Sequence, residues 1–256
     1  MRIAVITGAS SGMGREFALQ ITQKYRTINE IWLIARSKDK LELLALEISK
    51  IRSDINVRIL NYDITDEVCL NKYLDNLKAL KPSIRILVNA AGAGIIGSFD
   101  ETSQEDNSNM IDLNCKALVS ITKYSLPFMS KSGANIINIA SAAAYLPQPS
   151  FAIYAASKSF VLSFSRALNK ELKDRNIAVT AMCPGPVDTA FFDGAQKYHE
   201  VKTFKKAFRV SANKVVKLAL KDAYHCYPVS TYGIPMKLFR VLCKAVPKSI
   251  LISFIK

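Results

Sequence analysis

Tyr154 and Lys158 lie four residues apart, and Ser141 lies thirteen residues before the tyrosine. Positions i and i+4 share one face of a helix, so the phenol and the ammonium would point into the same space. A nearby cation favours the phenolate and lowers a pKa that is about 10 in an unperturbed tyrosine. The pair therefore has the chemistry of a proton donor and acceptor. The alternative is a pair without function, because helices often carry this spacing on a solvated face.

A glycine-rich turn lies near the start of the chain, between an apolar run at residues 3–6 and a helix expected to begin near Gly12. Glycines at such a turn let backbone N–H groups approach a pyrophosphate, whose charge the helix N-terminus favours. The alternative is an ordinary turn, since the glycine spacing differs from the common G-x-G-x-x-G pattern. We predict a phosphate site formed by Gly8, Ser10, Ser11, Gly12, Met13 and Gly14.

Arg36 follows the second apolar run, where an acidic residue would hold the ribose 2′-hydroxyl in an NAD site. A guanidinium forms paired hydrogen bonds to a phosphate, so Arg36 favours NADP (NADPH) over NAD. The alternative for Arg36 is a solvated loop residue. The sequence therefore predicts a site for NADP.

The fold is indicated by short, nearly continuous apolar runs that alternate with segments of helical character. The runs occur at residues 3–6, 31–35, 57–61, 84–88, 135–139 and 178–182. Such strands are buried on both faces, which requires a parallel sheet with helices on each side. We expect an α/β fold with a doubly wound parallel sheet, a Rossmann fold, in a single domain of residues 1–230.

These motifs together resemble those of the classical short-chain dehydrogenase/reductase family, over residues 1 to about 230. The resemblance rests on Thr7-Gly8-x-x-x-Gly12-x-Gly14, Asn89-Ala90-Ala91-Gly92, Asn114, Ser141, Tyr154-x-x-x-Lys158 and Pro184-Gly185. The order and the spacing of all of them agree with the family, except that Ala90 replaces the usual second asparagine.

The resemblance implies a role for each of four catalytic residues. Ser141 would hydrogen-bond the substrate carbonyl, and Tyr154 would donate or accept the proton. Lys158 would lower the Tyr154 pKa and hold the nicotinamide ribose. Asn114 would complete a water relay to Lys158; its alternative is a polar residue inside a helix, satisfied locally.

The resemblance also implies cofactor contacts beyond the glycine turn. Asp63 would contact the adenine; its alternative is a turn residue or the N-cap of the helix that follows. Tyr154 and Lys158 would contact the cofactor as well. The remaining residues expected at the cofactor are Asn89, Ala90, Gly92, Pro184, Gly185, Val187 and Thr189.

The expected activity is the NADP(H)-dependent interconversion of a ketone or aldehyde and an alcohol, with a small-molecule, lipophilic substrate. One alternative is an NADP-binding redox sensor or membrane-surface scaffold with little turnover, and another is a dehydrogenase that works in the oxidative direction. The resemblance implies a homo-dimer or homo-tetramer through the helices that carry Asn114 and Tyr154.

Positive charge is concentrated late in the chain. Residues 196–256 contain 13 basic side chains against Glu200 and Asp222, which leaves +11 of the total +14. Part of this charge lies in residues 198–209, within an expected substrate loop at about 188–212. Phe204 and Phe208 stand there among basic residues, which is a weak indication of nucleic-acid binding because no nucleic-acid module accompanies them. The alternative is a cationic cover over the substrate site that draws in an acidic or phosphate-bearing substrate.

The segment 231–256 is expected to be a basic amphipathic extension. Lys237, Arg240, Lys244 and Lys248 would line one helical face, opposite Leu238, Val241, Leu242 and Ala245. Pro247 should interrupt the helix, and the apolar runs beside it are too short to span a bilayer. The apolar face would cover the substrate cleft or a subunit partner, or the basic segment would contact a membrane surface.

Five scattered cysteines form no Cys-x-x-Cys pair, so neither a metal site nor a disulfide framework is expected. The chain begins with a short apolar run that leads directly into the glycine turn, unlike a signal peptide. These features favour a location in the reducing cytoplasm.

Overall fold

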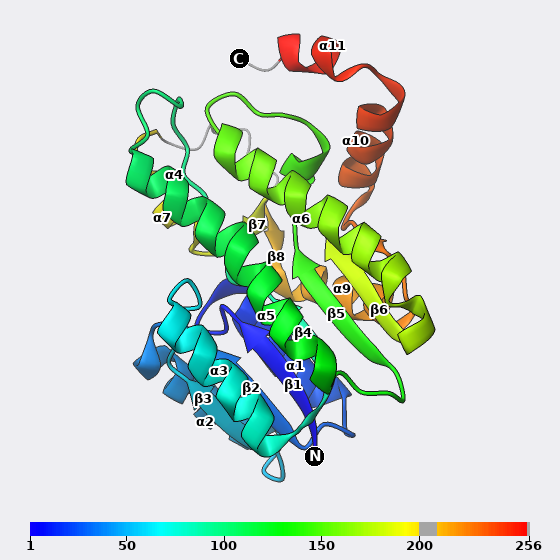
Figure 1. Ribbon diagram of the computed structural model, residues 1–256. Helices are drawn as coiled ribbons and strands as arrows, with labels where there is room; N and C mark the ends of the chain where they lie inside the picture. Colours follow the sequence, from blue (N-terminus) through cyan, green and yellow to red (C-terminus); the bar gives the residue numbers. More distant parts are fainter. Residues whose placement is uncertain (200–208, 255–256) are drawn as a thin grey trace.

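The structure is a computed structural model that describes residues 1–199 and 209–254. Its centre is a parallel sheet of seven strands (Figure 1). Across the sheet the strands are β3 (Asn56–Leu60), β2 (Glu30–Ile34), β1 (Arg2–Thr7), β4 (Ser83–Asn89), β5 (Ala134–Ile139), β6 (Ile177–Met182) and β9 (Val229–Ser230). The strand order runs outward from β1 in one direction and from β4 in the other, so the predicted doubly wound fold is confirmed.

Each of the six predicted apolar runs is a strand of this sheet, with ends that differ by at most one residue. The sequence analysis missed β9, a two-residue strand, and a separate pair of two-residue strands, β7 (Val187–Asp188) and β8 (Val210–Ser211). Segments this short are held by neighbouring backbone and carry no periodic pattern.

Helices cover both faces of the sheet. One face carries α1 (Gly12–Lys24), α2 (Lys38–Ile51) and α9 (Ala212–Tyr224), and the other carries α3 (Glu67–Leu80), α5 (Leu118–Ser125) and α6 (Ala152–Glu171). Further helices within residues 1–199 and 209–254 are α4 (Gln104–Ile111), α7 (Phe191–Ala195), α10 (Ile234–Ala245) and α11 (Lys248–Ser253). A π-helical segment, Asp112–Ala117, joins α4 to α5, and 3₁₀ turns cover Leu126–Phe128, Ala142–Tyr145 and Lys173–Arg175.

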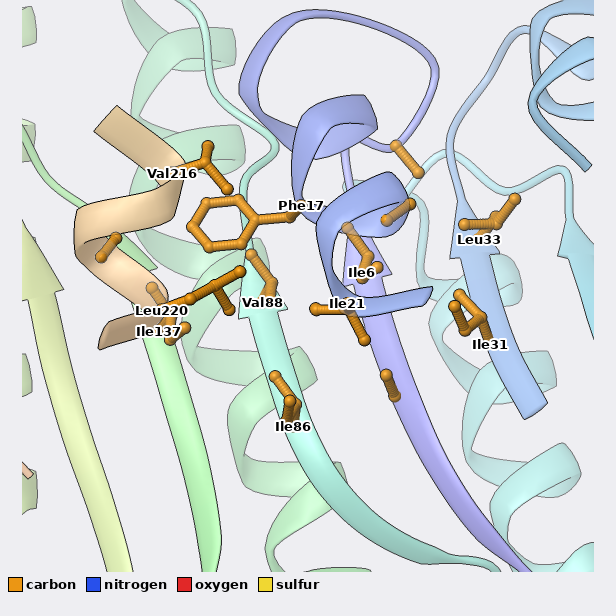
Figure 2. Close-up of a cluster of buried hydrophobic side chains, with 14 of the residues drawn as sticks. Ile6, Phe17, Ile21, Ile31, Leu33, Ile86, Val88, Ile137, Val216 and Leu220 are labelled. Carbon is orange, nitrogen blue, oxygen red and sulfur yellow. The ribbon is translucent and has the colours of Figure 1, made fainter. Parts of the chain in front are cut away.

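The core under α1 and α9 fixes where α1 begins. Phe17 and Ile21 of α1 are fully buried, and they pack with Val216 and Leu220 of α9 over Val88 of β4 (Figure 2). Burial of a side chain of this size contributes about 1.5–3 kcal/mol. The packing therefore holds the first turn of α1 at the carboxyl end of the sheet.

The opposite face contains Trp32, the single tryptophan of the chain. It is fully buried on β2, and its indole Nε1 donates to Glu30 Oε1 at 2.7 Å. The ring of Tyr73 from α3 meets it edge to face at 6.2 Å, and the Arg58 guanidinium lies 5.5 Å from its centroid. This cluster ties α3 to the edge of the sheet formed by β2 and β3.

The C-terminal helices follow the last strand and lie at one extremity of the molecule (Figure 1). Pro247 stands between α10 and α11, so the predicted interruption of the helix is confirmed. Within the described ranges no helix is long and apolar enough to cross a bilayer. Of the expected cationic cover, residues 200–208 lie outside the described residues, among them Lys202, Phe204, Lys205, Lys206 and Phe208.

One expectation for the extension is wrong in part. The side of α10 that packs on the protein carries Met236, Phe239 and Cys243, not the apolar face built on Leu238, Val241 and Leu242. The helix has two apolar stripes, and the surface at Tyr145 and Gly185, against which Phe239 and Met236 lie, determines which stripe is buried. The other stripe is exposed.

Candidate active site

A cleft opens at the carboxyl ends of the strands, where the order reverses between β1 and β4. Its cavity volume is about 520 Å³, within the range of small-molecule sites. Open α/β sheets bind ligands at this position. Among the residues predicted from the sequence, those that line it are Gly8, Ser10, Ser11, Gly12, Met13, Gly14, Arg36, Asp63, Ala90, Gly92 and Thr189.

The glycine turn is closely packed and directs the first turn of α1 into the cleft. A Cβ atom on Gly14 would lie 2.2 Å from the Gly8 carbonyl oxygen, and Gly8 itself has a φ of +66°. Ser11, the N-cap of α1, makes no side-chain capping bond, so the first N–H groups of the helix remain available to an anion. These features fit the pyrophosphate of a dinucleotide.

Thr7 connects the two strands at the switch point. Its Oγ1 accepts hydrogen bonds from the N–H groups of Ala90, at 3.1 Å, and Ala91, at 3.2 Å. The sequence analysis named Thr7 only as part of a motif. Asn89, by contrast, points away from the cleft and donates to Thr122 Oγ1 and Asn138 Oδ1 inside the protein, so here it supports the sheet.

Arg36 and Asp63 face each other across the edge of the cleft, with Arg36 Nη1 and Asp63 Oδ2 3.8 Å apart. The Arg36 side chain is 77 % exposed, which leaves its guanidinium free to meet an anion. Asp63 Oδ1 accepts from the N–H and hydroxyl of Thr65 in a tight turn. The N-cap of α3 is Asp66, so the alternative of Asp63 as that cap is wrong.

The predicted proton-transfer residues lie together behind the cleft. Tyr154 and Lys158 share one face of α6, and Lys158 Nζ lies 5.6 Å from the centroid of the tyrosine ring. Ser141, directly after β5, hydrogen-bonds the Tyr154 side chain. The next residue, Ala142, donates its N–H to the Pro184 carbonyl at 2.8 Å, which joins the ends of β5 and β6. Backbone from two strands and one helix therefore positions the three side chains.

Burial, more than charge, controls the pKa values of this group. Removal from solvent raises the pKa of Tyr154 to about 12, although the Ser141 hydrogen bond acts in the opposite direction. Burial also lowers the pKa of Lys158 to about 8, and its Nζ donates to the Ile139 carbonyl at 2.9 Å. The lowered Tyr154 pKa expected from the sequence is thus not found, because the burial that brings the cation close also desolvates the phenol.

Asn114 lies in the π-helical segment, a distortion that is frequent at functional sites. Its side chain exchanges two hydrogen bonds with the backbone of Ala93 and donates a third to Ser157 Oγ at 3.0 Å. A Cβ on Gly92 would lie 3.0 Å from Asn114 Oδ1 and 3.2 Å from Lys158 Nζ. Asn114 therefore fixes the backbone of the cleft wall at Ala93, close to Lys158.

The segment after β6 brings fewer residues to the cleft than predicted. Thr189 lines it, whereas Val187 is buried in β7 and packs into the core. Gly185 lies under α10, where an added Cβ would be 2.8 Å from the sulfur of Met236. Pro184 contributes its carbonyl to the bond with Ala142.

An aromatic wall beside Tyr154 was not predicted. Phe151 stacks on the tyrosine ring at 4.2 Å, and Phe191 of α7 lies 5.5 Å away, also lining the cleft. A Cβ on Gly94 would lie 2.6 Å from Phe191 Cζ and 3.0 Å from Tyr154 Cδ2. The spacing of Phe151 and Tyr154, i and i+3, could have predicted that the Phe151 ring lies beside the tyrosine. Phe191 is distant in the sequence, and only the fold brings its ring to the same place.

The comparison with protein families agrees with this geometry. The family model described as short chain dehydrogenase matches residues 2–199. The chain belongs to the short-chain dehydrogenase family. It is therefore an oxidoreductase that interconverts alcohols and carbonyls with a nicotinamide cofactor.

Three relatives of this short-chain dehydrogenase illustrate the likeness. The 17-beta-hydroxysteroid dehydrogenase type 3 of Mus musculus is 32 % identical over 223 residues, covering 85 % of this chain and 68 % of the relative. A short-chain dehydrogenase from Sphingobium yanoikuyae, solved with NADPH, is 28 % identical with a TM-score of 0.83, covering 100 % and 97 %. The bulky-bulky ketone specific alcohol dehydrogenase from Comamonas testosteroni is 25 % identical with a TM-score of 0.78, covering 100 % and 95 %.

Replacing the buried lysine of this short-chain dehydrogenase should change how stability depends on pH. The Lys158 pKa is about 8 in the folded protein and returns to the unperturbed value of 10.5 in the unfolded chain. Between pH 8 and pH 10.5, unfolding therefore takes up a proton at this side chain. Wild-type stability therefore gains on the order of 3 kcal/mol from this group as pH rises through that window. Lys158→Met lacks this pH-dependent gain. Its free energy of unfolding, measured with denaturant and compared with that of wild type, should therefore fall as pH rises from 8 to 10.5.

Lys50→Met, which removes an exposed lysine of α2, is the matched control for that experiment. Parallel curves for wild type and Lys158→Met would contradict a lowered Lys158 pKa.

Proposed function

We propose that this enzyme is an NADPH-dependent reductase of lipophilic ketones or aldehydes, with Tyr154 as its general acid. The observation that carries the proposal is the buried group of Ser141, Tyr154 and Lys158 directly behind the cleft that the glycine turn opens. A group of this kind, at the switch point of a doubly wound sheet, can polarise and protonate a carbonyl oxygen beside a bound dinucleotide.

Each side chain of this group has its own role in the proposed reaction. When bound, the cofactor supplies the hydride that the carbonyl carbon receives. Ser141 donates a hydrogen bond to the carbonyl oxygen, and Tyr154 gives that oxygen its phenolic proton. A phenol with a pKa of about 12 holds its proton until negative charge develops on the substrate, so the bond strengthens toward the transition state. Lys158 stabilises the phenolate that results.

The preference for NADP is proposed from Arg36. Its exposed guanidinium stands at the rim of the cleft after β2, where a 2′-phosphate would meet it. Asp63, already paired with Arg36, would then turn toward the adenine. The Sphingobium yanoikuyae enzyme was solved with NADPH, which supports this choice.

Arg36→Asp should lower the affinity for NADPH by roughly tenfold to a hundredfold, because it removes charge-assisted hydrogen bonds and adds a repelling carboxylate. NADH affinity should hold or rise. The measurement is titration of wild type and variant with both cofactors, followed by nicotinamide fluorescence. Arg26→Asp, which changes an exposed arginine outside the cleft, is the control. Equal binding of the two cofactors by wild type would contradict the NADP preference.

A lipophilic substrate is proposed from the wall around Tyr154. Phe151 and Phe191 flank the phenol, and Ile95 and Ile96 pack beside them. Relatives named for hydroxysteroids and for bulky ketones support the same class. NADPH oxidation with bulky and small ketones tests the proposal; binding of NADPH without turnover on any of them would favour the redox sensor or scaffold.

Pairing of copies through the helices that carry Asn114 and Tyr154 stays a prediction. It is supported by Ile111 at the end of α4 and Phe160 on α6, which are both exposed. The Phe160 ring stacks on Phe164 at 6.0 Å, so two aromatic rings lie together on this helix.

A further inference from the structure

The outer side of α10 carries an apolar stripe that is largely exposed to solvent. Ile234, Leu238 and Val241 are 73 %, 65 % and 61 % exposed, and Leu242 beside them is also exposed. Their spacing of four, seven and eight residues from Ile234 places them on one side of the helix. We call these four residues the outer stripe.

Exposed apolar residues also occur on α11 and directly after it. Ile250 and Phe254 are exposed as well, whereas Leu251 and Ile252 pack inward with Cys243 of α10. Each of the two helices therefore has apolar residues that contact the protein and others that are exposed to solvent. Soluble monomers rarely expose apolar patches of this kind without a partner.

The charged side chains of the segment that carries the outer stripe are all positive. Lys237 and Lys244 are exposed, seven residues apart along one border of the stripe, and Lys248 begins α11. The last acidic residue of the chain is Asp222, so the segment that contains α10 and α11 carries no negative side chain. An apolar stripe bordered by lysines matches the boundary of an anionic bilayer, where apolar side chains enter the acyl region and ammonium groups meet phosphates.

From these observations we propose that the outer stripe and its lysines dock this protein on anionic lipid bilayers. The occupant is a lipid surface rather than a second copy, because a copy related by a two-fold axis would place two patches of the same positive charge against each other, with no acidic residue of residues 223–256 to neutralise them. The inner side of α10 remains on the protein, where the Phe239 ring lies 6.4 Å from that of Tyr145. Docking therefore needs no unfolding of α10, and it does not depend on the proposed reaction.

The test is sedimentation of the full-length protein with vesicles of phosphatidylcholine alone or mixed with an equal part of phosphatidylglycerol. We expect wild type to pellet with the mixed vesicles and much less with the neutral ones, and its binding to the mixed vesicles should fall as salt is raised. Leu238→Asp with Leu242→Asp should reduce binding at least about tenfold. Lys237→Gln with Lys244→Gln should reduce it roughly thirtyfold, since each lysine is worth about fivefold.

Two controls separate docking from other causes. Leu43→Asp with Leu46→Asp changes exposed leucines of α2 and should leave vesicle binding unchanged. Light scattering of each protein follows its mass in solution. Failure of wild type to pellet would overturn the proposal, and so would equal pelleting of the stripe variant. Loss of an oligomer in the stripe variant without vesicle binding by wild type would assign the stripe to a second copy instead.

Discussion

Tyr154→Phe should lower kcat by roughly 10²–10⁴-fold while the affinity for NADPH changes little. The substitution removes the only atom that gives up a proton in the proposed step. The phenyl ring keeps its stack on Phe151, so the fold and the cleft stay intact. The measurements are NADPH oxidation with the best ketone of a panel and titration with NADPH alone.

Tyr73→Phe is the matched control, because Tyr73 is also fully buried and its hydroxyl is hydrogen-bonded to Ser125 at 2.7 Å, but on α3, away from the cleft. That variant should lose some stability and no activity. Substantial turnover by Tyr154→Phe would show that another group protonates the substrate.

The second large effect is expected at the glycine turn, where Gly14→Ala should lower the affinity for NADPH roughly a hundredfold. The new Cβ would meet the Gly8 carbonyl oxygen at 2.2 Å, so either the turn opens or the first turn of α1 moves away from the cleft. The same strain should lower stability by about 1–3 kcal/mol. Nicotinamide fluorescence and thermal unfolding measure the two effects.

Gly194→Ala is the control for this variant, since Gly194 also lines the cleft and a Cβ there has no neighbour within 4 Å. Ser10→Asp provides a second approach that leaves packing unchanged: a carboxylate at the predicted phosphate site should repel the cofactor. Unchanged NADPH binding in both Gly14→Ala and Ser10→Asp would remove the glycine turn from the cofactor site.

The sheet could be predicted because strands buried on both faces leave continuous apolar runs, and the cleft because Gly8, Gly12 and Gly14 follow the first of them. The pairing of Tyr154 with Lys158 followed from helical spacing alone. The tyrosine pKa did not follow, because it is raised by burial of the phenol, and part of the surroundings of Tyr154, such as Phe191, comes from a segment almost forty residues away.

At other positions the sequence did not show in which direction a side chain or a helix face points. Asn89 was correctly placed at a strand end, yet its side chain points into the protein toward Asn138. In α10 both stripes are apolar, and only the surface of Tyr145 and Gly185 decides which one is buried. The residue pattern of α10 alone therefore does not determine which of its two apolar stripes is buried.

The fluorescence of Trp32 reports on the edge of the sheet formed by β2 and β3, next to the proposed NADP site. Its indole is the only one in the chain, and it is fully enclosed on β2, four residues before Arg36. Its emission should be blue-shifted while the edge formed by β2 and β3 is intact and should move to longer wavelength when that edge loosens. Local opening at the proposed NADP end could thus be observed in the wild-type protein, without an added label.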